Sequence, residues 1–207
     1  MEDSRLPLAT NQCSMIAGLI LAAGESSRMG TDKALLLYRG RTFLEHILST
    51  FHEAGLKQLT VVLGHHADEI QRAVKLTGTE VVVNQDYRRG QTSSLQAGLH
   101  ALDQPAIQAI VLCLVDHPSV SAKVIRKLVA AFQQSAAPVV IPSYQGQRGH
   151  PVLISRALFA KLLVLSTSEG ANTVIRKYRD STQFVEVDDH GILVDVDDPE
   201  TYRALGR

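Results

Sequence analysis

Residues 16–33 read Ile16-Ala-Gly-Leu-Ile-Leu-Ala-Ala-Gly-Glu-Ser-Ser-Arg-Met-Gly-Thr-Asp-Lys33. The first six residues form an apolar run typical of a buried strand, and small residues follow it abruptly. Glycine lets a backbone approach a ligand closely, and successive amides in such a loop form a concavity that binds anions. Arg28 and Lys33 add cations that suit phosphate oxygens. The stretch therefore predicts a nucleoside triphosphate site directly after a first strand.

The spacing in this loop differs from two common nucleotide-binding motifs. A P-loop has four residues between its glycines and then Gly-Lys-Ser/Thr, whereas five residues separate Gly24 from Gly30 here. Lys33 comes three positions after Gly30. The G-x-G-x-x-G fingerprint of dinucleotide-binding folds is also missing, which disfavours an NAD-dependent oxidoreductase.

Length and charge limit the class of protein. The chain has 207 residues, 45% of them hydrophobic, which is enough to bury a core in one domain. We expect a flexible tail over residues 1–14 and a single domain over residues 15–207. The 21 basic and 21 acidic residues balance, so no overall positive field favours a nucleic-acid partner.

Cysteine usage and hydropathy predict a cytoplasmic protein. The two cysteines, Cys13 and Cys113, are far apart in the sequence, which argues against a disulfide framework or a zinc site. Residues 1–14 lack the features of a signal peptide. No apolar run approaches the ~20 residues of a membrane span, so we expect a soluble chain with no membrane partner.

Apolar runs rich in β-branched residues alternate with stretches of helical periodicity. Near-continuous apolar strands between amphipathic helices predict a mostly parallel sheet covered on both faces. Right-handed crossovers then give a three-layer, doubly wound α/β fold of Rossmann-like type. The expected strands are Ile16–Leu21, Leu59–Leu63, Glu80–Val83, Ile110–Val115 and Pro138–Ile141. The expected helices carry Phe43, Ile47, Leu48 and Phe51; Ile70 and Val74; Leu95, Leu99 and Leu102; and Val124, Leu128 and Phe132.

The segment from Leu21 to Lys33 resembles the pattern L-A-A-G-x-S-x-R-M-G-x-x-K of MobA-like NTP transferases, the family of the molybdenum cofactor cytidylyl- and guanylyltransferases. Every fixed position is met, and the resemblance extends over residues 15–205. It implies the fold of the nucleotide-diphospho-sugar transferases and transfer of a nucleotide to a phosphorylated acceptor. The nucleotide-binding residues that we expect are Leu21, Ala22, Ala23, Gly24, Ser26, Arg28, Met29, Gly30, Lys33, Ser93, Ser94 and Asp116.

Asp116 follows the strand Ile110–Val115 and precedes Pro118. A carboxylate at the carboxyl end of a strand, beside a phosphate loop, is well placed to hold Mg²⁺ or Mn²⁺, and the family carries Asp-x-Pro here. The alternative is that Asp116 caps the helix that begins near Ser121.

Two further acids, Asp195 and Asp197, alternate along an extended segment and so point to one side. The family ends in a similar D-x-D-x-P pattern, which implies Asp197 first and Asp195 second as metal ligands. The alternative is two solvated carboxylates on an edge. The next residues, Asp198 and Pro199, predict an ordinary helix start.

Gly149, His150 and Pro151 resemble the segment that lines the acceptor side of the cleft in the molybdenum cofactor branch. Gly149 would let the backbone meet a flat pterin, and His150 would hydrogen-bond the acceptor; the alternative is a structural histidine. The chain departs from the family at His117, where Gln or Met is common. For the pair His65-His66 we expect diverging side chains, no metal site and a helix start.

The identity of the base depends on Ala22 and Ala23. Guanylyl-transferring relatives usually have glycines there, and two methyl groups narrow the pocket in favour of a pyrimidine. We therefore expect CTP. Ser93 and Ser94 would contact the base or ribose, or would cap the helix that they begin.

The expected reaction is transfer of CMP from CTP to the phosphate of molybdopterin-bound molybdenum, with release of pyrophosphate. Arg28 would hold the β- and γ-phosphates, Lys33 the α-phosphate or the acceptor phosphate, and Asp116 the metal. A molybdenum hydroxylase is the implied protein partner. The alternatives are another phosphorylated acceptor (a sugar phosphate, methylerythritol phosphate or phospholactate), GTP as donor, or a non-catalytic accessory protein that binds pterin or nucleotide.

Overall fold

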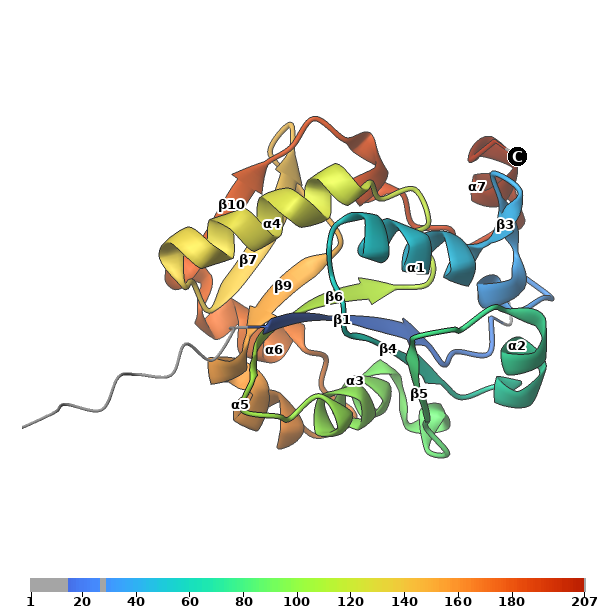
Figure 1. Ribbon diagram of the computed structural model, residues 1–207, viewed down its shortest axis with the longest axis horizontal. Coiled ribbons are helices and arrows are strands. Elements are labelled where there is room, and N and C mark those ends of the chain that lie inside the picture. Colours follow the sequence, from blue (N-terminus) through green and yellow to red (C-terminus); the bar gives the residue numbers. More distant parts are fainter. Residues whose placement is uncertain (1–14, 27–28, 207) are drawn as a thin grey trace, which may run out of the picture.

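A computed structural model describes residues 15–26 and 29–206 of the chain. Figure 1 shows a central sheet with helices on both of its faces. The expectations for the tail over residues 1–14 and for Arg28 lie outside the described residues.

The elements follow the alternation that the sequence predicts, with several additions. The strands are β1 (Met15–Ala22), β2 (Leu37–Tyr38), β3 (Arg41–Thr42), β4 (Leu59–Leu63), β5 (Glu80–Val83), β6 (Ile107–Leu114), β7 (Val139–Tyr144), β8 (Gln147–Arg148), β9 (Val152–Ser155) and β10 (Thr182–Glu186). The α-helices are α1 (Phe43–Glu53), α2 (Ala67–Ala73), α3 (Gln91–Ala101), α4 (Ala122–Ser135), α5 (Phe159–Leu163), α6 (Asn172–Lys177) and α7 (Pro199–Ala204). Short 3₁₀ turns include η1 (Lys33–Leu35), η2 (Tyr87–Arg89) and η5 (His190–Leu193).

The main sheet has the strand order β10-β7-β9-β6-β1-β4-β5, with β8 paired to β7. Strand β1 runs parallel to β4 and β6, β4 to β5, and β10 to β7. Strand β9 is antiparallel to both β6 and β7. The short connection from β7 through β8 to β9 has no room for the crossover that a parallel strand needs. The predicted fold class, a mostly parallel α/β sheet, is confirmed.

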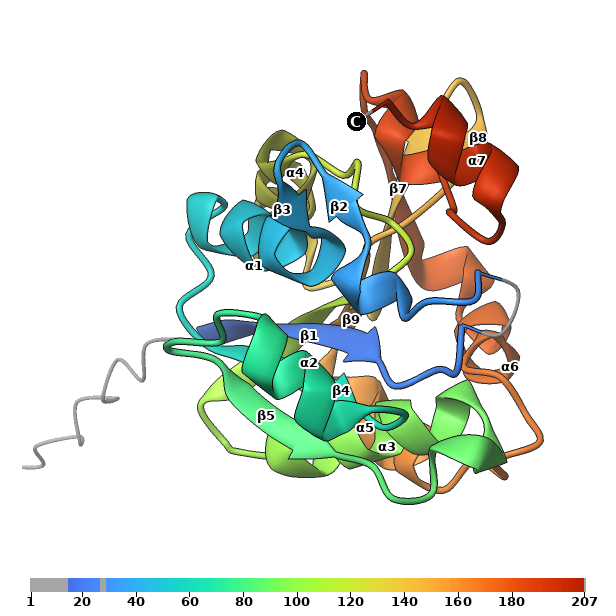
Figure 2. The same ribbon diagram turned by 90° about the vertical axis from the view of Figure 1, so that its right-hand side faces the viewer.

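Two apolar layers hold helices against the sheet. On one face α1, α2 and α4 contribute Leu44, Ile70 and Leu128 to a buried cluster. On the other, α3, α5 and α6 contribute residues such as Leu99 and Leu162, and Figure 2 shows these two layers from the side. No helix in the described part of the chain is both long and apolar enough to cross a bilayer.

The sheet brings distant loops to one edge. Leu21 lies opposite Leu114 in the parallel pair β1–β6, so the residues after both strands emerge side by side. The C-terminal segment joins them, because the Val196 amide donates to the Asp116 carbonyl at 2.9 Å. The carboxyl ends of parallel strands are where open α/β sheets bind ligands.

Candidate functional site

A cavity of about 330 Å³ lies at this edge of the sheet. Most residues that the sequence predicts for nucleotide binding line it: Leu21, Ala22, Ala23, Gly24, Ser26, Met29, Lys33, Ser94 and Asp116. The cavity is also lined by residues that the sequence analysis did not single out: Asp32, Ala34, Tyr87, Gly90, Gln91, Leu114 and Val115. Several of these lie in the loop between β5 and α3, which the rule for strand ends points to as a whole.

Backbone hydrogen bonds fold the small-residue loop back on itself. The Met29 amide donates to the Ser26 carbonyl at 2.8 Å, and the Lys33 amide donates to Ser26 Oγ at 3.0 Å. Gly30 has a φ of 65°, a conformation that favours glycine. Gly30 is not among the residues that line the cavity, and its contact with nucleotide stays a prediction. The loop thus delivers Lys33 to the cavity at the start of η1.

Lys33 lies between two carboxylates that are far away in the sequence. Its Nζ donates to Asp116 Oδ2 at 3.1 Å and to Asp197 Oδ1 at 2.5 Å. The Lys33 side chain is only 11% exposed. Burial opposes its charge, but the hydrogen bond to Asp197 and the charge of Asp116 outweigh that cost, and the pKa of Lys33 lies above 10.5. The cavity therefore contains a charged ammonium at neutral pH.

The second oxygen of Asp116 faces a different group of side chains. Asp116, His117 and Asp195 each offer a ligand atom, and these atoms lie within 4.8 Å of one another. Asp116 Oδ1 is buried, and among the described residues it has no hydrogen-bond partner. Desolvation, and then the charge of Asp116, raise the pKa of Asp195. Such a buried, unpartnered oxygen beside a second acid and an imidazole fits a divalent cation.

The two C-terminal acids therefore have different surroundings. Asp197, which the sequence favours as the metal ligand, binds Lys33 in this structure, whereas Asp195 is the acid grouped with Asp116. Asp198 caps α7 by accepting from the Glu200 and Thr201 amides, as predicted. The alternative role of Asp116 as a helix cap is wrong, because α4 begins after Ser121.

His117 and His150 stack with their ring centroids 4.6 Å apart. Burial, and then the charge of His117, lower the pKa of His150 to about 4. His150 lines a second cavity of about 130 Å³, which shares Leu21, Gln91 and Leu114 with the first. The sequence did not show that His117 reaches into this group, because a lone histidine after a strand carries no positional signal.

Gly149 packs closely against the backbone of η5. A Cβ at this position would lie 2.2 Å from the Ile192 carbonyl oxygen, and the His150 amide donates to that same carbonyl at 3.0 Å. A side chain at position 149 would therefore collide with η5, and the contact of Gly149 with the acceptor stays a prediction. Pro151 is buried and does not line the second cavity.

The serines at the start of α3 divide their roles. Ser94 lines the cavity, whereas the Ser93 hydroxyl donates to the Asp86 and Gly90 carbonyls. The side-chain amide of Asn84 donates to the hydroxyls of Ser93 and Ser94, at 2.9 and 3.0 Å respectively. Neither serine caps α3, whose N-cap is Gly90. The contact of Ser93 with nucleotide stays a prediction.

The comparisons with known proteins agree with this geometry. Residues 18–182 match the MobA-like NTP transferase domain. The chain is 32% identical to nicotine blue oxidoreductase of Paenarthrobacter nicotinovorans, over 99% of this chain and 100% of that one. It is 24% identical to the molybdenum cofactor cytidylyltransferase of Escherichia coli, over 91% and 94%.

Solved structures show the same fold. The crystal structure of Rv0371c from Mycobacterium tuberculosis superposes with a TM-score of 0.84 at 35% identity, covering 93% of this chain and 97% of that one. A complex of Rv0371C with manganese superposes with a TM-score of 0.78 at 32% identity, covering 92% and 97%. The loop, the cavity and the relatives together show that this chain belongs to the MobA-like NTP transferase family and is a nucleotidyltransferase.

Proposed function

We propose that the protein transfers CMP from CTP to the phosphate of molybdopterin-bound molybdenum, with release of pyrophosphate. The observation that carries this proposal is the charged Lys33 held between Asp116 and Asp197 in a cavity lined by Ala22 and Ala23. An ammonium and a carboxylate group at the ends of β1 and β6 suit a triphosphate with its metal.

The proposed preference for a pyrimidine base depends on Ala22 and Ala23. Each is only 5% exposed, and both line the cavity. In the proposal, these alanines narrow the space beside the base more than two glycines would. One methyl group discriminates by about 1–3 kcal/mol, and two favour the smaller pyrimidine without making the choice absolute. The similarity to a molybdenum cofactor cytidylyltransferase agrees with this preference.

The chemistry needs alignment and charge rather than a protein nucleophile. An oxygen of the acceptor phosphate attacks the α-phosphorus of CTP, the new P–O bond forms, and the bond to the bridging oxygen breaks. Pyrophosphate leaves with that electron pair. Lys33 Nζ stabilises negative charge on the transferring phosphate, because its raised pKa keeps it protonated. Arg28, which lies outside the described residues, stays the predicted ligand of the β- and γ-phosphates.

Asp116 and Asp195 would hold the divalent cation, with His117 at its side. When bound, the cation neutralises charge on the phosphate oxygens. Carboxylate ligands suit both Mg²⁺ and Mn²⁺, and Rv0371C has been solved in complex with manganese.

The second cavity is the proposed acceptor side. It adjoins the first, its lining is mostly apolar, and His150 supplies a neutral imidazole. An apolar slot with few polar groups suits a flat heteroaromatic ring. This arrangement supports a pterin acceptor over a sugar phosphate, whose hydroxyl groups need many hydrogen-bond partners.

The test is pyrophosphate release from each of the four NTPs, with Mg²⁺ or Mn²⁺, with and without molybdenum-loaded molybdopterin. Release from CTP only when the cofactor is present supports both donor and acceptor. Release from CTP only with a sugar phosphate or methylerythritol phosphate would overturn the acceptor. Calorimetric CTP binding without any turnover would favour an accessory protein, which also accounts for a molybdenum hydroxylase as partner.

A second candidate is an oxidoreductase that acts on a flat heteroaromatic compound. The name of the Paenarthrobacter relative, which matches over its full length, favours this reading. Anaerobic incubation of the protein with NADH or NADPH and a heteroaromatic dye separates the two candidates. Metal-independent bleaching of the dye would support the redox activity, whereas pyrophosphate release from CTP without bleaching would support nucleotidyl transfer alone.

A further inference from the structure

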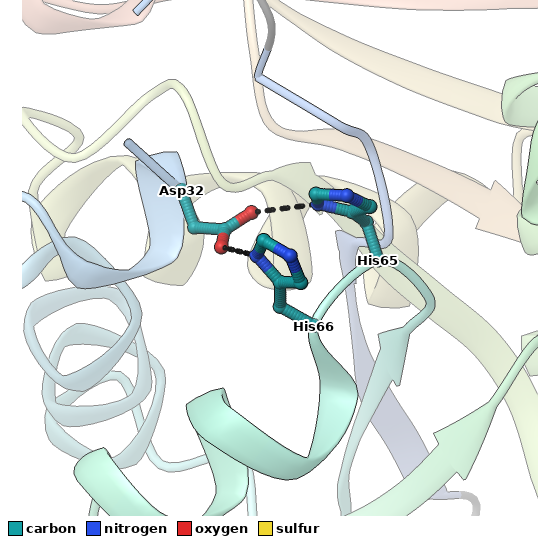
Figure 3. A group of neighbouring side chains, drawn as sticks. All are labelled: Asp32, His65 and His66. Carbon is teal, nitrogen blue, oxygen red and sulfur yellow. Dashed lines mark hydrogen bonds and ion pairs between the residues drawn. The ribbon is translucent and has the colours of Figure 1, made fainter. Parts of the chain in front are cut away.

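Asp32, His65 and His66 form a group at the side of the cleft, which we call the Asp32 cluster. His65 and His66 follow β4 and lead into α2, whereas Asp32 directly precedes η1. The expectation that the two histidine side chains diverge is wrong, as Figure 3 shows. Their ring centroids lie 3.7 Å apart, because His66 has a φ of 48° that departs from the extended backbone in which neighbours alternate.

Both imidazoles present the same nitrogen to Asp32. His66 Nδ1 lies 2.8 Å from Asp32 Oδ2, and His65 Nδ1 lies 3.4 Å from Asp32 Oδ1 (Figure 3). The Asp32 side chain is 7% exposed, so one buried carboxylate and two imidazole nitrogens converge on one point. The three ligand atoms lie within 4.8 Å of one another.

We propose that the Asp32 cluster is a second metal site, selective for Zn²⁺ and similar transition-metal ions and separate from the carboxylates around Asp116. Ligand atoms around a tetrahedral ion with bonds of 2.0–2.1 Å lie about 3.4 Å apart. His66 Nδ1 lies 2.8 Å from one oxygen of Asp32, and His65 Nδ1 lies 3.4 Å from the other. Binding therefore requires the side chains to adjust until one oxygen of Asp32 and both Nδ1 atoms, which already lie within 4.8 Å of one another, face a single ion.

The ligand chemistry sets the selectivity. Imidazole suits Zn²⁺, Co²⁺ and Ni²⁺, whereas Mg²⁺ and Ca²⁺ prefer oxygen ligands. In the metal-free protein each neutral imidazole can donate its Nδ1 proton to Asp32. On metal binding the proton moves to Nε2, and the Nδ1 lone pair becomes the ligand. Three protein ligands leave a fourth position for water, and the 53% exposed His66 side chain gives the ion a path from solvent.

The site would join two loops that frame the cleft. Asp32 is the neighbour of Lys33, and the His65 amide donates to the Ala23 carbonyl at 3.2 Å. A bound ion would tie the loop that delivers Lys33 to the end of β4. Occupancy would therefore stabilise the folded protein by mass action, whether or not nucleotide is bound.

The experiment uses the full chain with Cys13→Ser, freed of metal with a chelator, in the absence of nucleotide. Zn²⁺ binding is measured by calorimetry, and Co²⁺ binding by the visible absorption of tetrahedral Co²⁺. Asp116→Asn with Asp195→Asn removes the two acids that are proposed to hold the metal of nucleotidyl transfer, which we call the cleft carboxylates. His65→Ala and His66→Ala remove one ligand each of the Asp32 cluster, and His100→Ala is the matched control on the exposed side of α3.

We expect one Zn²⁺ to bind the Asp116→Asn/Asp195→Asn variant with the same affinity as the parent protein. His65→Ala and His66→Ala should each weaken that binding at least about tenfold and remove the tetrahedral Co²⁺ bands, whereas His100→Ala should change neither. Circular dichroism in chelator shows that each variant is folded. Unchanged affinity in both histidine variants, or no Zn²⁺ binding once the cleft carboxylates are removed, would overturn the proposal. Neither result depends on nucleotidyl transfer, so the two proposals fail separately.

Discussion

Replacing Lys33 by methionine tests the charge at the centre of the cleft. The change keeps the length of the side chain and removes an ammonium that contacts Asp116 and Asp197 at 3.1 and 2.5 Å. Loss of one charged donor to a transition state typically lowers turnover by about 10²–10³-fold, or about 3–4 kcal/mol. We expect a loss of that size in the rate of pyrophosphate release from CTP.

The same substitution should affect stability less. Opposite charges about 4 Å apart attract by about 4 kcal/mol at an effective dielectric constant of 20. The cost of burying the Lys33 ammonium offsets part of this attraction. The Asp197 side chain is 35% exposed, so solvent screens the attraction between Lys33 and Asp197. We therefore expect a loss of about 2 kcal/mol in the free energy of unfolding, which leaves a typical domain folded.

A measurement of metal affinity distinguishes loss of a phosphate-binding group at Lys33 from disruption of the whole site. Removal of a cation beside Asp116 should leave Mn²⁺ affinity unchanged or higher, as measured by the electron paramagnetic resonance of free Mn²⁺. Lys57→Met, at an exposed position, is the matched control and should keep full turnover. A Lys33→Met protein with turnover within threefold of the parent would refute the assigned role of Lys33.

Three further predictions concern the pocket and the buried groups. Ala22→Gly with Ala23→Gly should raise the GTP-to-CTP ratio of turnover by at least about tenfold, since each methyl group discriminates by about 1–3 kcal/mol; an unchanged ratio would remove the argument from pocket width. The pKa of His150 is lowered to about 4 from 6.5 by burial and then by the charge of His117, so the unfolded chain takes up this proton first as pH falls. The contribution of His150 to the free energy of unfolding is complete above pH 6.5 and is lost as pH falls towards 4, by about 1.4 kcal/mol per pH unit. We expect His150→Gln to reduce the dependence of the free energy of unfolding on pH, measured by urea unfolding of metal-free protein between pH 5 and 7. The control His100→Gln should leave this dependence unchanged. Burial raises the pKa of the Cys113 thiol, so the reactive thiolate is scarce in the folded protein. In a Cys13→Ser protein at pH 8, we expect an aromatic disulfide reagent to modify Cys113 only as fast as the protein unfolds. Faster modification would show that the interior opens locally.

Local pattern was sufficient for most of the fold. The predicted runs within β1, β4 and β6 are apolar because both faces of a parallel sheet are covered there. The edge strand β5 was recognised from its three valines, although its residues are only partly buried or exposed. The helical spacing of Phe43, Ile47 and Phe51 matches the buried face of α1. The strand β10 and the helices α5 and α6 were not among the predicted elements, because their short or partly exposed segments carry weak periodicity.

The place of the antiparallel strand β9 in the sheet depends on tertiary context that the local sequence does not carry. Val152, Leu153 and Ile154 read as a strand in the sequence, but their place between β6 and β7 depends on long-range pairing. Gly149 is another, because the reason for a glycine there is the Ile192 carbonyl, which lies far away in the sequence.

By itself, the sequence determined the α/β class, the family and the loop that carries Lys33, because strand and helix periodicity and a contiguous motif are local properties of the chain. Only the tertiary structure decided how the acids divide: Asp197 binds Lys33, and Asp195 lies with Asp116 and His117. It also decided that His65 and His66 converge on Asp32. Such contacts join residues about 30 to 160 positions apart, and they depend on which strands lie side by side and on single backbone angles such as the φ of His66, neither of which is written in local periodicity.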